Sequence, residues 1–345
     1  MKVHFEELSA PKRAGGIEAA THELAAHLLA LNVQVTRSAL GETCAQPDCV
    51  HVHGIWSPAL ARKFMAWHRR GVPCVVTPHG MLETWSFAHK RMKKLLGWHL
   101  YQKRLLQRAA VLHGTSERET GQFKKLGLRP PTAMITWGVE MPLHNRKAES
   151  GKRKPEIRTA LFVGRIFPVK GLPLLVRAWA RVRPAGWRLK IVGPDEAGHR
   201  AEVAALVREL ALEQAVEFTG ELTGAAKAAA FQGADLYLQP SYTENFGMAI
   251  VEALAHALPV VTTTGTPWRQ LPERGCGWWV APSVDELARA LSESTAMEGE
   301  RRLQMGLNGR EWVEKEFAWP QTAQRMKEIY LLAQGKIDQP DIVRT

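Results

Sequence analysis

The sequence predicts an α/β fold built from two Rossmann-like, doubly wound domains. Short apolar runs alternate with helical segments in both halves, which is the βαβ rhythm of a parallel sheet. This rhythm stops in a polar stretch at 142–156 and then starts again. The length of 345 residues suits two domains of about 150 residues each, and 45% hydrophobic residues suffice for two cores.

The expected domain boundaries follow from this pattern. The N-terminal domain covers 1–141, a linker rich in charge, Pro and Gly covers 142–156, and the C-terminal domain covers 157–318. Trp319-Pro320 then breaks the chain before a final helix at 321–334.

The N-terminal half opens with a strand at Val3–Phe5, a loop, and a helix from Ile17 to Leu31. The loop ends in the pair Gly15 and Gly16, which by itself indicates a tight turn. The dinucleotide fingerprint G-x-G-x-x-G is missing, so the sequence does not support a dinucleotide cofactor.

Three histidines lie near the ends of the strands that follow. These strands are expected over 33–36, 49–53 and 73–77. Ligands of open parallel sheets bind beyond the carboxyl ends of the strands, although a single histidine is more often structural than catalytic. His79 is the best candidate because it follows a strongly apolar strand and precedes a glycine. His53 is the second choice, and His51 is expected to be a packing residue.

The segment 87–108 is expected to form a long helix or helix pair with a basic surface. It holds seven Lys/Arg, and no acidic residue lies between Glu83 and Glu117. Its expected apolar face consists of Met92, Leu95, Leu96 and Leu100. Trp98 and Tyr101 are amphipathic, like side chains at membrane interfaces. The pattern favours an anionic membrane surface over two alternatives, a core helix with a solvated basic face and a site for an acceptor phosphate.

The net charge of +12 is unevenly distributed. Residues 1–150 hold 21 Lys/Arg and 11 Asp/Glu, giving +10, whereas residues 151–345 hold 25 and 23, giving +2. The N-terminal half is therefore the part expected to meet an anionic partner. No RNA-binding motif appears, so we expect no nucleic-acid partner.

The remaining composition indicates a cytoplasmic protein without a metal site. The four cysteines show no metal-ligand spacing and are expected to be reduced. No apolar run approaches about 18 residues, and the N-terminus is too short and acidic for a signal peptide.

The C-terminal half repeats the strand-loop-helix order, beginning with a strand at 159–164. The loop that leaves this strand carries Arg165 and Lys170, before a helix at 172–182. Two cations at the carboxyl end of a first strand suit a diphosphate, and solvated loop charge is the alternative.

The stretch 239–254 is the centre of the chain. A strand ends at Pro240, a polar loop follows, and a helix starts beside Gly247. A helix N-terminus presents free N–H groups to an anion, and a glycine lets the anion approach. Glu244 and Glu252, eight residues apart, suit hydroxyl groups, and the alternative is a dipole-favoured acid with a solvated one.

The string Glu-x-Phe-Gly-x-x-x-x-Glu-Ala over 244–253 resembles the Glu-x7-Glu signature of retaining, glycogen synthase-like glycosyltransferases of family 4. The Gly-Arg-x5-Lys-Gly type string at 164–171 is similar to that family too. The resemblance implies GT-B architecture, in which two Rossmann-like domains face each other across a cleft and a C-terminal helix packs back onto the first domain.

The resemblance also implies roles for single residues. Glu252 would bind the ribose hydroxyls, Glu244 the transferred sugar, and the backbone near Phe246 and Gly247 the diphosphate. His79 would lie near the sugar. The expected donor-binding residues are Gly15, Gly16, Arg165, Lys170, Glu244, Asn245, Phe246, Gly247 and Glu252. The expected catalytic residues are His79, Glu244, Arg165 and Lys170.

The activity implied is the metal-independent transfer of a hexosyl group from a nucleoside diphosphate sugar, with retention. No cofactor is expected. The acceptor would be a glycan or a lipid-linked molecule, held by the basic N-terminal domain. The product would belong to cell-surface polysaccharide or lipopolysaccharide, made by an enzyme that lies peripherally on the inner face of the membrane.

Three positions depart from the family pattern: Trp137, Trp268 and Cys276. Trp137 stands where Asn is common, Trp268 where an acid usually follows Pro, and Cys276 where Asn is usual. Two other functions fit parts of the sequence. One is a nucleotide-sugar epimerase of the same architecture, and the other is a basic protein that binds membranes or nucleic acid.

Overall fold

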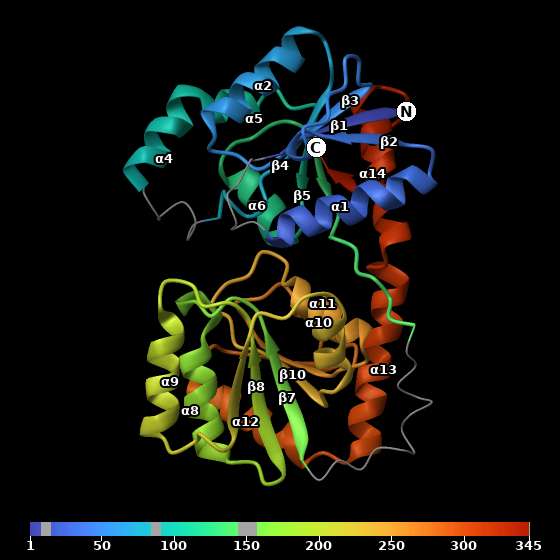
Figure 1. Cartoon of the computed structure of the whole chain (residues 1–345). Helices are drawn as coiled ribbons and strands as arrows, with labels where there is room; N and C mark the ends of the chain where they lie inside the picture. The colour runs from blue at the N-terminus through green and yellow to red at the C-terminus, as the bar shows by residue number, and fades with distance from the viewer. Residues whose placement is uncertain (8–14, 84–90, 144–156, 345) are drawn as a thin grey trace. The chain divides into compact units, whose positions relative to one another are not determined.

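The computed structural model describes residues 1–7, 15–83, 91–143 and 157–344. The chain divides into two compact units, each built on its own sheet (Figure 1). Unit 1 consists of Met1–Gly138 and Trp319–Thr345, and unit 2 of Val139–Ala318. The predicted linker 142–156 falls almost wholly outside the described residues.

Unit 1 contains a seven-stranded sheet in the order β13-β6-β5-β4-β3-β1-β2. The strands are β1 (Lys2–Glu7), β2 (Gln34–Arg37), β3 (Cys49–His53), β4 (Cys74–Thr77), β5 (Val111–Gly114), β6 (Thr132–Met134) and β13 (Val343–Arg344). All pairs are parallel except β13 with β6. Strand β2 lies on one side of β1, and β3 and the strands after it lie on the other side. The neighbours β1 and β3 therefore form a switch point, where ligands of such sheets bind.

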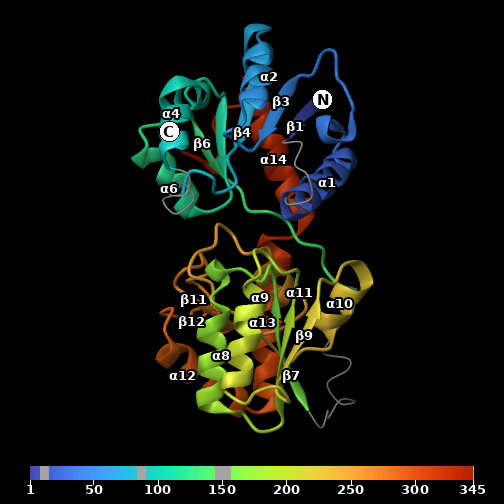
Figure 2. The ribbon, with the colours of Figure 1, turned by 60° about the vertical axis from the view of Figure 1, so that its left-hand side comes forward.

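Helices cover both faces of this sheet (Figures 1 and 2). They are α1 (Gly15–Ala30), α2 (Pro58–Arg69), α4 (Arg91–Gly97), α5 (Lys103–Leu106), α6 (Glu117–Lys125) and α14 (Trp319–Ala333). Side chains of α2, α5 and α6, such as Phe64, Leu106 and Phe123, share one core with β3 and β4. On the other face, α14 packs against α1.

Unit 2 contains a six-stranded, fully parallel sheet in the order β12-β11-β10-β7-β8-β9. The strands are β7 (Arg158–Val163), β8 (Trp187–Val192), β9 (Val216–Gly220), β10 (Leu236–Gln239), β11 (Val260–Thr263) and β12 (Gly277–Val280). Neighbours β7 and β10 form the switch point of this sheet, because the order runs outward from them in both directions.

The helices of unit 2 form two layers around its sheet. They are α8 (Leu172–Val182), α9 (His199–Glu209), α10 (Gly224–Gln232), α11 (Met248–Ala255), α12 (Val284–Ala296) and α13 (Gly299–Glu316). Helix α8 packs against α9 and α12, and α11 packs against α13 (Figure 1). The largest buried side chain of the α8 layer is Trp179, which is 1% exposed.

The predicted helix 87–108 is only partly correct. Residues 87–90 lie outside the described residues, and from Arg91 the helix contains a π-helical turn at Trp98–Gln102 between α4 and α5. Trp98 is 6% exposed and packs in the core, so its expected interfacial position is wrong. None of the helices in the described part of the chain has the length and hydropathy of a membrane-spanning segment.

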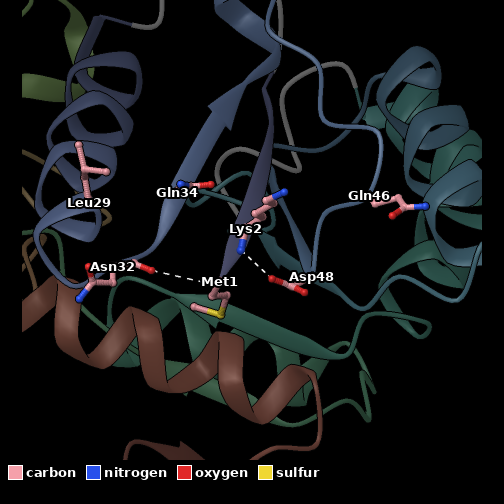
Figure 3. A pocket seen from close by; sticks show the side chains of 7 residues that line it. All are labelled: Met1, Lys2, Leu29, Asn32, Gln34, Gln46 and Asp48. Atoms are coloured by element: carbon pink, nitrogen blue, oxygen red, sulfur yellow. Dashed lines mark hydrogen bonds between the residues drawn. The ribbon is translucent and has the colours of Figure 1, made fainter.

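A polar hollow of about 430 Å³ opens beside the first residues of β1 and β2 (Figure 3). Across it, Lys2 N donates to Asp48 Oδ2 at 2.7 Å, and the Met1 amino group donates to Asn32 O at 3.4 Å. These are the amino ends of parallel strands, opposite the edge where such sheets bind ligands. No residue predicted for the functional site lines this hollow.

Candidate functional site

The switch point of unit 2 brings Lys170 and Glu244 together. Lys170 ends the short 3-10 turn after β7, and Glu244 lies in the loop after β10. The Lys170 ammonium forms an ion pair with Glu244 Oε1, and each side chain is 13% exposed. The same oxygen accepts hydrogen bonds from Gln239 Nε2 at 2.7 Å and Ser241 Oγ at 2.8 Å. Glu244 is therefore held as a carboxylate beside a cation at the carboxyl ends of two adjacent strands.

Backbone contacts join the loops that carry this pair. Tyr242 N donates to Val169 O at 2.8 Å, and Glu244 N donates to Gly265 O at 2.9 Å in the loop after β11. Gly171, the residue after Lys170, has φ +69° and packs against the backbone of Pro240. A Cβ at this position would lie 2.1 Å from the Pro240 carbonyl oxygen. Only glycine fits there, and the close approach fixes the distance between the two loops.

Glu252 lies in α11, and Gly247 precedes this helix as its N-cap. Gly247 adopts φ +87°, which glycine reaches without strain, and the first turn of α11 follows it directly. Lys227 of α10 places its Nζ 2.7 Å from the Glu252 carboxylate. Sequence reasoning missed this lysine, since only the fold brings α10 beside α11.

Tyr237 connects the two glutamates electrostatically. Its hydroxyl is buried on β10, where it donates to the Val163 carbonyl at 3.2 Å. Burial, and then the charges of Glu252 and Glu244, raise the pKa of Tyr237 well above its ordinary value.

Arg165 makes different contacts. Its guanidinium pairs with Glu196 and lies 5.9 Å above the Phe167 ring, and its side chain is 52% exposed. The loops after β7 and β8 run together here, because Ile166 N donates to Pro194 O at 2.8 Å. Arg165 thus shares the loop of Lys170, but in this structure it pairs with the loop after β8 rather than with Glu244.

Asn245 and Phe246 complete the loop between Glu244 and Gly247. Phe246 is 6% exposed and packs on Trp268 with ring centres 5.4 Å apart. Trp268 Nε1 donates to the Phe246 carbonyl oxygen at 2.6 Å. The unusual tryptophan after Pro267 therefore supports the backbone of this loop, a role that no local sequence pattern indicated.

In unit 1, His79 lies two residues after the end of β4 in a strained, half-buried position. Its φ is +56°, and its ring stacks on Trp137 at 5.6 Å and on His53 at 5.4 Å. His79 Nε2 lies 3.3 Å from His53 Nδ1, and among the described residues no hydrogen-bond partner reaches His79 Nδ1. Burial, and then His113, lowers the pKa of His79 to about 3, so it is neutral at pH 7. Trp137, one of the departures from the family pattern, is thus part of the surroundings of His79.

Glu119 fixes the turn that follows His79. This carboxylate is fully buried and accepts from Gly80 N at 2.6 Å and from Thr115 N at 2.9 Å. The spacing of Ser116 and Glu119 predicts a capping box, and Ser116 Oγ does accept from Glu119 N. The link from Glu119 to the His79 turn was not predictable, because the two segments are 39 residues apart.

Gly15 and Gly16 are the first residues of α1, beyond the carboxyl end of β1. Arg37, at the end of β2, forms a buried two-oxygen ion pair with Glu7 at the end of β1, with Nη2 2.7 Å from Oε1. Taken one unit at a time, the described residues bring no three His, Cys, Asp or Glu side chains close enough to share a metal ion. Metal independence stays a prediction.

Two protein-family models match the chain. "Glycosyl transferases group 1" matches residues 145–312, and "Glycosyl transferase 4-like domain" matches residues 37–136. The matched ranges contain the loops that carry Lys170, Glu244 and Glu252 in unit 2 and His79 in unit 1.

Curated relatives include two D-inositol 3-phosphate glycosyltransferases. That of Kineococcus radiotolerans is 34% identical over 311 residues, covering 82% of this chain and 71% of the relative. That of Actinosynnema mirum is 28% identical over 262 residues, covering 69% and 61%. The GDP-mannose:cellobiosyl-diphosphopolyprenol alpha-mannosyltransferase of Xanthomonas campestris is 29% identical over 228 residues, covering 65% and 58%. The chain thus spans less than two thirds of the length of the last two.

Solved structures show the same fold. Sucrose-phosphate synthase from Thermosynechococcus elongatus superposes with a TM-score of 0.77 at 20% identity, covering 95% of this chain and 98% of that one. Anabaena HepE in complex with UDP and glucose superposes at 0.74, also at 20% identity, covering 95% and 99%. The likeness confirms the GT-B fold that the sequence resemblance implied.

Proposed function

Because the chain belongs to the group 1 glycosyl transferases, we propose that it moves a hexosyl group from a nucleoside diphosphate sugar to an acceptor hydroxyl. The transfer retains the anomeric configuration and uses no metal ion. The acceptor is a glycan or a lipid-linked molecule, and the product is cell-surface polysaccharide or lipopolysaccharide. The Xanthomonas relative, whose name includes a polyprenol-linked acceptor, supports this class.

The observation that carries the proposal is the pairing of Lys170 with Glu244 at the switch point of unit 2. A diphosphate needs cations and free N–H groups, which Lys170, Arg165 and the first turn of α11 supply. Sugar and ribose hydroxyls need acceptors, which Glu244 and Glu252 supply. One edge of one sheet therefore presents both kinds of groups.

The proposed reaction forms the bond between the acceptor oxygen and the anomeric carbon while the bond from that carbon to the phosphate oxygen breaks. The proton of the acceptor hydroxyl passes to the departing phosphate oxygen on the same face of the sugar. Lys170 and Arg165 stabilise the charge that develops on the diphosphate, which is the role a metal ion takes elsewhere. His79, neutral at pH 7, is proposed to hydrogen-bond the transferred sugar.

The test is turnover by the purified full chain. Candidate donors are nucleoside diphosphate sugars, beginning with UDP-glucose and GDP-mannose, and they are offered with and without polyprenol-linked and soluble glycan acceptors in the presence of a chelator. We expect one donor to be consumed only when an acceptor is present, giving a glycoside of unchanged anomeric configuration.

Two variants assign the chemistry. Lys170→Ala and Glu252→Ala should each lower turnover by more than about a hundredfold, because each removes a charge-assisted contact to the donor. Lys190→Ala, which removes a lysine from β8, is the matched control and should keep wild-type turnover. Donor consumption without any acceptor would support the epimerase instead, and unchanged rates in both variants would refute the site.

A further inference from the structure

One helical segment of unit 1 exposes a row of large apolar side chains. Met92, Leu96 and Leu100 are 80%, 63% and 65% exposed. They follow each other at intervals of four residues, so they lie on one side of the helix. Of the eight large apolar side chains that the described residues expose, three lie here. Single exposed leucines are ordinary, but an aligned row indicates a contact surface.

The row is not a core face left uncovered. The opposite side of the same segment is already packed, since Trp98, Leu105 and Leu106 are buried in the core of unit 1. Leu95, which the sequence placed with the exposed row, is half-buried. The helix is therefore docked on its sheet by one stripe and presents a second apolar stripe outward.

Cations flank the exposed row. Lys93, Lys103 and Arg104 are exposed on the same segment, and the sequence has no acidic residue between Glu83 and Glu117. A helix that exposes aliphatic side chains together with Lys/Arg fits the boundary between the headgroups and acyl chains of an anionic bilayer.

We propose that the basic apolar face, defined as Met92, Lys93, Leu96, Leu100, Lys103 and Arg104, binds the surface of an anionic lipid membrane. A second copy of the chain suits this face poorly, because it would oppose cations with cations. Nucleic acid suits it poorly as well, because three aliphatic side chains occupy its centre. The inference goes beyond the glycosyl transfer proposed above and needs neither donor nor turnover.

The test is sedimentation of the full chain with vesicles. One set of vesicles mixes phosphatidylglycerol with phosphatidylcholine, and the other is phosphatidylcholine alone. We expect binding to the first set only, weakening as salt screens the charges. Lys93→Glu with Lys103→Glu should lower the partition coefficient by more than about twentyfold, since each cation contributes about fivefold. Leu96→Asp with Leu100→Asp should abolish binding at any salt concentration, because the apolar contact is then lost.

Matched controls separate the face from overall charge and hydropathy. Lys124→Glu with Lys125→Glu changes two exposed lysines of α6, and Leu40→Asp changes an exposed leucine of the same unit. Both controls should lower binding far less than the variants of the basic apolar face. The proposal is overturned if the wild type binds neither set of vesicles, or if controls and face variants bind alike. It is equally overturned if Leu96→Asp instead dissociates a dimer, or if the face variants lose affinity for DNA while vesicles never bind. A chain that binds vesicles but transfers no sugar would leave this inference standing and refute only the proposed function.

Discussion

Lys170 and Glu244 form an ion pair between two loops that lie 74 residues apart in the sequence. Each residue lies in the loop that follows a different strand of the switch point, and both side chains are mostly shielded from water. Without a donor, the lysine that would meet a diphosphate is neutralised by the glutamate that would meet a sugar. The ion pair thus holds together the two loops of the proposed donor site.

This pair should be measurable in the absence of any ligand. Lys170→Met, Glu244→Gln and the double variant form a cycle in which we expect a coupling free energy of about 1–3 kcal/mol in chemical denaturation. The losses in the free energy of unfolding of the two single variants should add up to more than the loss in the double variant. The reason is that each single variant leaves a partly buried group unpaired. Additive effects in the cycle would contradict the pairing.

Gly171 tests the spacing of the two loops. Gly171→Ala places a methyl group 2.1 Å from the Pro240 carbonyl oxygen at φ +69°, so we expect a loss of more than about 2 kcal/mol in the free energy of unfolding. Gly198→Ala is the control, since Gly198 has a similar φ of +77° and nothing within 4 Å of the added carbon. This control substitution should cost about 1 kcal/mol. Equal losses in thermal or chemical unfolding would show that the loops do not approach this closely.

Glu119 tests the turn that carries His79. Glu119→Gln replaces one carboxylate oxygen with an NH2 group, which cannot accept a hydrogen bond. Either Gly80 N or Thr115 N then loses its acceptor, so we expect the free energy of unfolding to fall by about 1–3 kcal/mol. If Glu119 positions His79, kcat should fall while the affinity for nucleoside diphosphate stays that of the wild type. Glu117→Gln, on the exposed side of the same helix, is the control for both measurements. A variant with lower stability but unchanged kcat would make Glu119 purely structural.

Four histidines of unit 1 predict sensitivity to acid. Burial lowers the pKa of His79 to about 3 and that of His113 to about 4, and it lowers the pKa values of His51 and His53 well below the ordinary value. Between about pH 6.5 and these folded values the unfolded chain binds more protons, so the free energy of unfolding decreases as the pH falls. Denaturant titrations at a series of pH values measure this slope. His79→Gln should make the slope shallower by up to one proton, and an unchanged slope would contradict the assignment.

The sequence predicts much of the fold because strand and helix patterns are local. The strand at 49–53 and the helix beginning beside Gly247 were expected from an apolar run and a glycine, and the strand expected over 73–77 begins one residue later, at Cys74. The pairing of Lys170 with Glu244 could not be read from spacing, since the order of β7 and β10 in the sheet decides it.

One error and two omissions have physical causes. The helix near Trp98 carries two apolar stripes, and periodicity alone cannot tell which of them packs on the sheet. Trp268 and Lys227 gain their roles from contacts with Phe246 and Glu252, which come from other segments of the chain.

The most direct test of the donor site is calorimetric titration of the full chain with a panel of nucleoside diphosphates, in the presence of a chelator. We predict that one of them binds, and that Lys170→Ala and Glu252→Ala each weaken it by about tenfold to a hundredfold, as expected when a charge-assisted hydrogen bond is lost. A wild-type chain that binds none of these nucleotides, or variants that bind them as tightly as the wild type, would contradict the central claim.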